Sequence, residues 1–318
     1  MQKFLVPIAA IFLSIFSASA VTPASAQGLP SRTWVSGTGS DANNCGRTTP
    51  CATFTGAFQK TAPGGEINCI DGGAFGSVTI TNAISIICDD VEAGVLVSGT
   101  NGIVVNAGAN DVVRLSGLDI FGTVTGVEGV RFLAGAALHI SKSVVHGFQN
   151  GGTSGFGIHV LPSSGTTQVV IENTVVSESG GSSSGAGILV QPSSGATVNA
   201  VIKNVQAIND GAGVRFDGTG GPVTGSLYNV TMSGNLRSGL SAVGANSVKV
   251  VVDSSSMTGN GIGAAVAGTG ATIGLTRSAV TANTTGLVIT SGTISSYGDN
   301  EIDNNVTDGP APTPASHH

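Results

Sequence analysis

Residues 211–216 read GAGVRF, and versions of this stretch recur through most of the 318-residue chain. Each version is a glycine followed by an apolar residue, any residue and a second apolar residue. Successive versions lie 23 to 30 residues apart. A period of this length indicates a repeat architecture. The leading glycines are Gly102, Gly129, Gly157, Gly187, Gly213, Gly239, Gly263 and Gly286.

A repeat with three-residue apolar strands cannot bury its own apolar face, so stacking on neighbouring repeats must bury it. In each triplet the two flanking residues point to one side and the middle residue points to the other. The LxxLxLxxN and GGxGxDxUx repeat patterns are absent, and a β-sandwich would not keep one register over eight repeats. The sequence therefore predicts an all-β fold: a single-stranded right-handed parallel β-helix (solenoid) with a short N-terminal capping α-helix.

A second series of short apolar strands runs out of phase with the first, and asparagines follow three of them. Asn235, Asn260 and Asn283 stand at equivalent points of successive repeats. A side-chain amide at one turn of each coil can bond the next asparagine and nearby backbone groups. We expect these residues to form a structural ladder and to have no functional role.

The N-terminus has the features of an export signal, which we place at residues 1–26. Lys3 precedes an apolar run, residues 4–16, that is too short to span a bilayer. Residues 24–26 form a small-x-small cleavage site, and residues 18–20 are a second candidate. We expect a mature chain from Gln27 that is periplasmic or extracellular and has no stable membrane span.

The rest of the chain divides into three parts. Residues 27–65 form an N-terminal segment in which Phe54, Ala57 and Phe58 make the apolar stripe of a short capping helix. Residues 66–305 form the β-helix. Residues 306–318 form a Pro-rich, loose tail that ends in His317 and His318.

Four cysteines follow the signal peptide, and an exported protein can form disulfides. Four cysteines allow three pairings. We favour Cys45 with Cys51, which closes a short loop, and Cys69 with Cys88, whose spacing of 19 residues suits adjacent coils. A zinc site is the weaker interpretation, because no CxxC motif or nearby His pair accompanies them.

The composition makes nucleic acid an unexpected partner. The formal net charge is −6 and only 9% of the residues are charged, so no basic patch is available for a phosphate backbone. The 49 glycines, together with many β-branched residues, suit short strands joined by tight turns. A disordered chain would carry more charge.

The outward-facing middle residues of the triplets are polar chiefly in the middle repeats. The next outward position, two residues further on, is also polar there. A long face rich in hydroxyl and amide groups suits an extended glycan. We predict a polysaccharide-binding surface made by Arg131, His159, Gln191, Arg215 and Asp217.

The candidate catalytic residues are Arg215 with Asp217 beside it, and Asp210 just before the strand. A proton-transfer role for His159 would need an adjacent carboxylate or hydroxyl. Its stacked neighbours are Arg131 and Leu189, which offer neither. We therefore interpret His159 as a surface residue that contacts an adjacent coil.

Four stretches closely resemble a known group of proteins. They are RTWVSGTGSDANNCGRTTPCATFTGAFQKTAPGGEI (residues 32–67), AFGSVTITNAISI (74–86), VSGTNGIVVNAGANDVVRLSGLDI (97–120) and SYGDNEIDNN (296–305). The chain resembles uncharacterised exported right-handed β-helix proteins common in alphaproteobacteria. The resemblance implies the pectate-lyase-like fold superfamily, and it implies no established activity.

Three other functions stay open. Pectate lyases hold calcium with several carboxylates, but no acidic residues share the outward stripe on neighbouring repeats, and RxPxxR and WxDH are missing. A glycosidase needs two carboxylates about 5–5.5 Å or about 6.5–9.5 Å apart, and of the polygalacturonase motifs only an isolated Asp89-Asp90 pair is present. A structural or adhesive envelope protein is the third possibility. We assign no enzymatic activity, no metal site and no cofactor, with calcium expected only under the lyase alternative.

Overall fold

The computed structural model describes residues 28–316, apart from residues 151–154 and 182–183. The predicted signal peptide, both cleavage sites, the predicted new terminus at Gln27 and the pair His317 and His318 lie outside the described residues. Within the described part of the chain, no helix is both long enough and apolar enough to cross a membrane.

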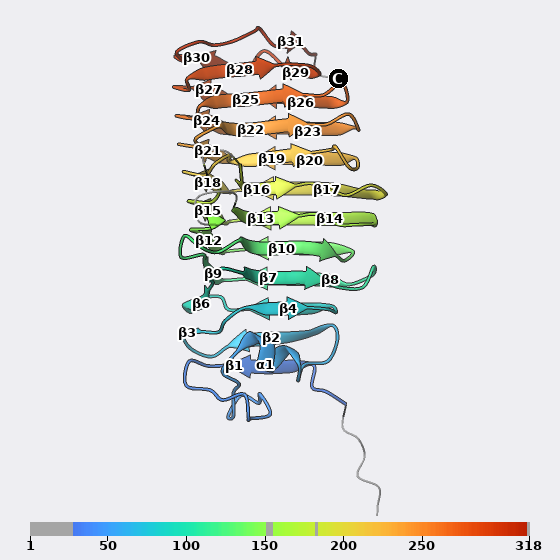
Figure 1. The fold of residues 1–318 in the computed structure, drawn as a ribbon, viewed down its shortest axis with the longest axis vertical. Helices are drawn as coiled ribbons and strands as arrows, with labels where there is room; N and C mark the ends of the chain where they lie inside the picture. The colour runs from blue at the N-terminus through green and yellow to red at the C-terminus, as the bar shows by residue number, and fades with distance from the viewer. Residues whose placement is uncertain (1–27, 151–154, 182–183, 317–318) are drawn as a thin grey trace, which may run out of the picture.

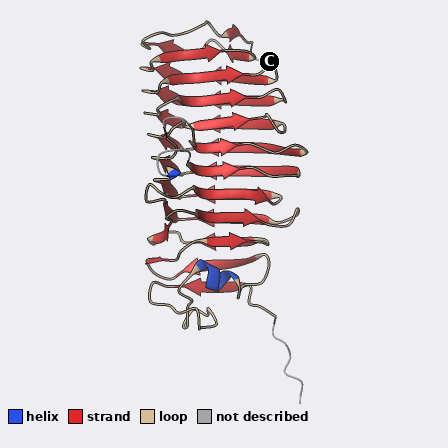
Figure 2. Ribbon diagram, in the orientation of Figure 1, coloured by secondary structure: helices blue, strands red, loops and turns tan. Residues whose placement is uncertain are grey.

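The chain winds into a right-handed parallel β-helix whose coils stack along the long axis of the molecule (Figures 1 and 2). Three parallel sheets run along the stack, and they have 12, 9 and 10 strands. A typical coil takes one strand from each: β19 in the 9-stranded sheet, then β20 in the 12-stranded sheet, then β21 in the 10-stranded sheet. The predicted fold class is confirmed.

Along most of the sequence, successive strands belong to the three sheets in turn. The 12-stranded sheet contains β1 (Arg32–Val35), β2 (Gly65–Cys69), β5 (Ile84–Ile87), β8 (Val112–Ser116), β11 (Ala137–Ser141), β14 (Gly165–Glu172), β17 (Ala196–Lys203), β20 (Val223–Tyr228), β23 (Val248–Asp253), β26 (Ala271–Thr276), β29 (Thr293–Ser296) and β31 (Thr313–Pro314). The 9-stranded sheet contains β4 (Val78–Ile80), β7 (Asn101–Asn106), β10 (Glu128–Ala134), β13 (Phe156–Val160), β16 (Ala186–Val190), β19 (Val214–Asp217), β22 (Ser238–Val243), β25 (Ile262–Ala267) and β28 (Thr285–Ile289). The 10-stranded sheet contains β3 (Gly73–Ala74), β6 (Ala93–Leu96), β9 (Leu118–Phe121), β12 (Val144–His146), β15 (Val175–Ser177), β18 (Gln206–Ile208), β21 (Thr231–Ser233), β24 (Ser256–Thr258), β27 (Ala279–Thr281) and β30 (Glu301–Asp303).

The repeated triplets form the strands of the 9-stranded sheet, in register from coil to coil. Ile188 pairs with Val214, and Val190 pairs with Phe216. Both flanking residues of the GAGVRF triplet, Val214 and Phe216, are fully buried, while Arg215 between them is partly exposed. The triplets therefore supply a continuous apolar core, in which each fully buried side chain contributes about 1.5–3 kcal/mol before the entropy of ordering is subtracted.

The predicted asparagine ladder is present inside the turns that lead from the 10-stranded to the 9-stranded sheet. The side-chain Nδ2 of Asn235 donates to Asn260 Oδ1 at 2.9 Å, and Asn260 Nδ2 donates to Asn283 Oδ1 at 3.0 Å. Each backbone N–H also donates to the next Oδ1. Asn305 continues the ladder beyond Asn283. These buried amides satisfy polar backbone groups that the tight turns would leave unpaired.

The N-terminal end of the stack is covered by the predicted helix, α1 (Phe54–Phe58). The Thr53 side chain accepts a hydrogen bond from Gly56 N and so caps the helix N-terminus. Phe54 is fully buried and its ring lies 5.1 Å from that of Phe75, centroid to centroid. The helix thus shields apolar side chains of the first coils from water.

Both favoured disulfides are present, Cys45–Cys51 and Cys69–Cys88. The second links β2 to the residue that follows β5, and these strands are neighbours in the 12-stranded sheet. At the other end, the segment expected to be a loose tail contributes β31, which pairs with β29. Its residues remain exposed.

Replacing a buried ladder residue is expected to cost far more stability than replacing an exposed one. Asn260→Ala removes the acceptor shared by Asn235 N and Asn235 Nδ2, and it removes a donor to Met232 O, so we expect a loss of roughly 3 kcal/mol. The control is Asn204→Gly, because Asn204 belongs to an exposed asparagine row and has φ = 53°, which glycine tolerates. It should cost less than about 1 kcal/mol. Urea unfolding midpoints would test this, and equal losses would contradict the ladder's role.

Candidate functional site

The outward residues of the 9-stranded sheet form one column along the stack. Register pairs Val104 with Arg131, Arg131 with His159, His159 with Leu189, and Leu189 with Arg215. The structure therefore places the predicted binding residues on one face and in neighbouring coils. It gathers them into two groups, one around His159 and one around Arg215.

The first group shows that the interpretation of His159 as a surface residue is wrong. His159 is only 6% exposed, and its Nδ1 lies 3.0 Å from Glu128 Oε1. The same oxygen accepts a hydrogen bond from Arg131 Nη1 at 3.1 Å. The Phe156 ring packs against the imidazole, with the ring centroids 4.6 Å apart. Glu128 thus supplies the adjacent carboxylate that a proton-transfer role for His159 requires and that its stacked neighbours do not offer.

The triplet pattern does not predict Glu128, because this residue lies outside the triplet. It starts β10, one residue before the repeat glycine Gly129, and its register partners are Asn101 and Phe156. A carboxylate directly before a repeat glycine occurs in no other triplet, and that was the available signal. The Glu128 Oε2 and His159 Nε2 atoms are buried and have no hydrogen-bond partner among the described residues.

The second group holds the Asp217 carboxylate in a dense set of donors. Asp217 Oδ2 accepts from Arg215 Nη2 at 2.7 Å and from Gln191 Nε2 at 3.2 Å. Its Oδ1 accepts from the Thr219 hydroxyl at 2.7 Å and from Thr219 N at 3.0 Å. Burial acts to raise the pKa of Asp217, but the Thr219 and Arg215 contacts outweigh it and lower the pKa below its ordinary value. Asp217 is therefore a charged anchor for Arg215.

Arg237 joins the second group, although sequence reasoning missed it. Its Nη2 donates to Gly185 O. Burial lowers the pKa of the Arg237 guanidinium, and the nearby charge of Arg215 acts in the same direction. No triplet position pointed to Arg237, because it lies before β22 in the turn that follows the ladder residue Asn235.

A buried apolar cluster separates the two groups. Leu189, Ala186 and Ala212 form a small buried cluster outside the main core, and Phe156 packs against it. A cavity of about 170 Å³ opens here, between Phe156, Leu189 and the Arg215 group. A second cavity, of about 230 Å³, adjoins it at Gln191 and is lined by Leu161, Pro192 and Thr219 among others.

The same column carries a further cavity at its N-terminal end. It measures about 450 Å³ and lies between α1 and the first strands, with Phe58, Thr79 and Val104 in its lining. Thr79 and Val104 are register partners that precede Arg131 in the column. Hollows therefore occur at both ends of the row of polar side chains.

The prediction that Asp210 belongs to this site is wrong. Asp210 is fully buried and occupies the ladder position before Asn235: its backbone N–H donates to Asn235 Oδ1 at 2.9 Å, and its Oδ1 accepts from Ser179 N at 2.8 Å. Its Oδ2 takes the place of an asparagine Nδ2, is buried beside Gly187 and has no partner among the described residues. Burial raises the pKa of Asp210 well above its ordinary value, a shift that the Ser179 contact opposes and Glu178 reinforces.

Among the described residues, no group of three or more His, Cys, Asp or Glu side chains could hold a metal ion. The groups present on the face are guanidinium donors, buried carboxylates, one carboxylate–imidazole pair and a buried apolar cluster. Such a set can bind anionic and hydroxyl groups, and the carboxylate–imidazole pair can exchange a proton.

No family model and no curated protein sequence matches the chain. Two solved structures are similar in fold. A pectate lyase, Pel9A, is 14% identical, with 87% of this chain and 79% of that chain covered and a TM-score of 0.49. A rhamnogalacturonan lyase is 13% identical, with 83% and 72% covered and a TM-score of 0.42. At this level of similarity no residue role transfers to this chain.

The Asp210 rung predicts a specific pH dependence of stability. Below about pH 3.9 the carboxyl is protonated in both the folded and the unfolded chain. As the pH rises, the unfolded chain ionises first, and stability falls by about 1.4 kcal/mol per pH unit until the raised folded pKa is reached. Asp210→Asn supplies the missing Nδ2 and cannot ionise. The stability of this variant relative to the natural chain should therefore increase steadily with pH over this window.

The measurement is urea unfolding of both proteins at several pH values. The matched control is the reverse change at the next ladder position, Asn235→Asp. It should add a second loss of stability with rising pH, in the same direction as that caused by Asp210. A stability difference between Asp210→Asn and the natural chain that does not change with pH would contradict a neutral carboxyl at this rung.

Proposed function

We propose that the outer face of the 9-stranded sheet, from β10 to β19, binds an acidic polysaccharide of the periplasm or the cell exterior. The observation that carries the proposal is an asymmetry within the two ion pairs. The side chains of Arg131 and Arg215 are 32% and 33% exposed, whereas those of their partners Glu128 and Asp217 are 5% and 3% exposed. A ligand therefore meets guanidinium N–H groups, with the carboxylates beneath them.

Each guanidinium keeps donors for a ligand. Arg131 and Arg215 each use one terminal nitrogen for the carboxylate partner, and a guanidinium carries five N–H donors. Planar guanidinium groups recognise carboxylates with two parallel hydrogen bonds. The sugar component favoured is consequently a uronic acid or another carboxylated unit.

The spacing of these groups fits an extended chain. Arg131 and Arg215 are separated by three strand steps in the column, which amounts to about 14 Å along the stack. The partly exposed ring of Phe156, which packs on the buried Leu189 cluster, lies between them, and a sugar ring can pack against it. A polymer lying along the axis would contact both guanidinium groups, whereas a single monosaccharide would reach only one.

A second candidate function is cleavage of the bound polymer, as in a lyase or glycosidase. The Glu128–His159 pair favours it, because a carboxylate that orients an imidazole is a common proton-transfer arrangement. The His159 Nε2 atom is buried, so catalysis would require the Phe156 side of the site to open. Calcium would enter only in a lyase of the pectate type, as a cofactor brought by the reaction medium.

Binding is tested first on an array of acidic and neutral glycans, followed by titration of each polymer that binds. Arg215→Ala should weaken binding of an acidic polymer by about tenfold, the effect of losing one charged hydrogen-bonding group. Arg114→Ala removes the same charge from an exposed position on the 12-stranded sheet and should bind as the natural chain does. Binding should also weaken as salt is added.

Two results would overturn the binding proposal. One is an array with no acidic polymer bound, which would favour the structural or adhesive role. The other is unchanged affinity in Arg215→Ala, which would place the binding site elsewhere on the molecule.

Cleavage is tested separately, by ultraviolet absorbance of unsaturated products and by reducing-end release, with and without calcium. If the second candidate holds, His159→Gln should abolish turnover while leaving polymer binding measurable. The absence of products from every polymer that binds would leave binding as the function.

A further inference from the structure

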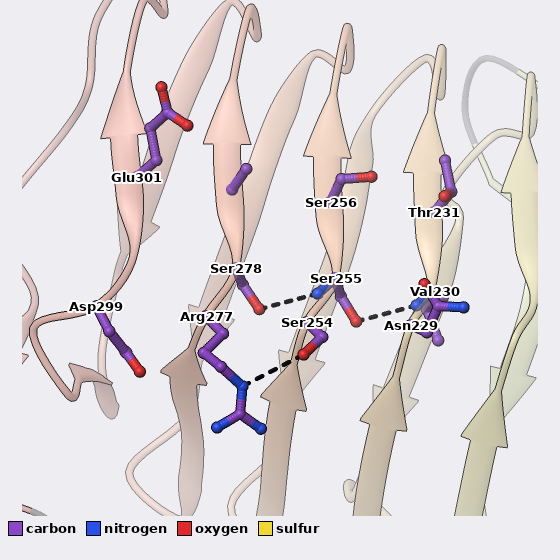
Figure 3. A pocket seen from close by; sticks show the side chains of 11 residues that line it. Asn229, Val230, Thr231, Ser254, Ser255, Ser256, Arg277, Ser278, Asp299 and Glu301 are labelled. Atoms are coloured by element: carbon purple, nitrogen blue, oxygen red, sulfur yellow. Dashed lines mark hydrogen bonds between the residues drawn. The ribbon is translucent and has the colours of Figure 1, made fainter.

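The 12-stranded and 10-stranded sheets meet at a corner that forms a groove in the C-terminal coils. Consecutive strands of the two sheets are joined there by two-residue turns, such as Asn229-Val230 between β20 and β21. The first residue of each turn has positive φ, 52° at Asn229, 50° at Ser254 and 46° at Arg277. The groove encloses a cavity of about 460 Å³ (Figure 3), which lies in the size range of small-molecule sites.

Small side chains make the groove deep at this point. The first residues of β12, β15 and β18 are Val144, Val175 and Gln206, which fill the same position in earlier coils. In the later coils this position holds Thr231, then Ser256, then Ala279, before Glu301 closes the row. Because Thr matches Val in size, the wall recedes at Ser256 and Ala279, over two successive coils.

Three polar side chains on this wall have no partner among the described residues. No hydrogen bond or ion pair involves the side chains of Thr231, Ser256 or Glu301 in that part of the chain. Figure 3 shows Thr231 and Ser256 on neighbouring strands of one sheet and Glu301 two strands further on. The hydroxyls deeper in the corner are committed to structure: Val230 N donates to Ser255 Oγ at 3.0 Å, and Ser255 N donates to Ser278 Oγ at 3.2 Å. The unpartnered row is thus distinct from the structural one.

The charges of the groove differ from those of the 9-stranded sheet. The Arg277 guanidinium pairs with Asp253 and also donates to Ser254 Oγ. Asp299 accepts a hydrogen bond from Thr276 at 2.8 Å. Asp299 and Glu301 line the groove together with Arg277, whose charge Asp253 balances. The groove therefore disfavours an anionic ligand and offers hydroxyl and carboxylate groups to an uncharged one.

We infer that this groove is a binding site for a neutral saccharide chain that lies along the β-helix axis. Successive coils advance by about 4.8 Å, which is close to the length of one extended sugar unit. Thr231, Ser256 and Glu301 would then present hydrogen-bonding groups to the first, second and fourth of four successive sugars, and Ala279 would leave room for the ring of the third. This site uses the other two sheets, so it is independent of the function proposed for the 9-stranded sheet.

The experiment titrates the purified protein with a panel of uncharged hexasaccharides of glucose, mannose, xylose and galactose, followed by saturation-transfer NMR and calorimetry. Ser256→Tyr fills the groove and should weaken binding of the hexasaccharide that binds best by at least about tenfold. Glu301→Gln should weaken it by several-fold, because a neutral amide is a poorer acceptor than a carboxylate.

Ser226→Tyr is the matched control: the same change at an exposed position on the outer face of β20. It should bind like the natural chain, and circular dichroism should show that all variants keep their β structure. The inference is overturned if the natural protein binds none of the hexasaccharides, or if Ser256→Tyr binds them as well as Ser226→Tyr does.

The same variants separate this site from the one on the 9-stranded sheet. Arg215→Ala should leave hexasaccharide binding intact, and Ser256→Tyr should leave binding of acidic polymers intact. Loss of both kinds of binding in Ser256→Tyr would contradict two independent sites.

Discussion

The structure depends on one constraint: no coil can bury its own apolar side chains, so each coil must present the same inward residues at the same height as its neighbours. Val214 and Phe216 are fully buried only because Ile188 and Val190 precede them in register and Leu240 and Ala242 follow. A slip of one residue would turn Arg215 into the core. This constraint explains why the sequence repeats, and the right-handed β-helix follows from it.

The same constraint leaves the middle residue of each triplet free to vary, and the chemistry of the molecule has collected there. In the middle coils the column changes from guanidinium to imidazole to leucine and back to guanidinium within four strands. The carboxylates that balance these cations lie beside the column and are covered, since the side chains of Glu128 and Asp217 are 5% and 3% exposed. Burying the acid and exposing the base gives a face with donor character on a chain whose formal net charge is −6.

The fold and the column could be predicted because both follow from periodicity, and the contacts within the site could not. The triplets fix which residues stack on which, so the sequence predicts that Arg131, His159 and Arg215 share one column, although it does not predict that His159 is buried. The partners came from other positions: Glu128 precedes a repeat glycine and Arg237 lies in a turn. Contacts between residues at unlike positions depend on side-chain direction and loop path, which periodicity does not encode. The resemblance noted in the sequence implied the fold alone, and the structure agrees with that part.

Asp210 shows how a repeat can mislead when only part of it is used. Its position just before β19 suggests an acid beside the candidate site. Its spacing indicates a ladder position instead, because it lies 25 residues before Asn235, the same distance that separates Asn235 from Asn260. Its backbone carbonyl also accepts a hydrogen bond from Leu236 N at 2.9 Å, immediately before Arg237. The ladder rung therefore supports the segment that brings Arg237 to the candidate site. The acid contributes to that site through the backbone it holds, and the requirement for stacked, satisfied turns governs the surface as it governs the core.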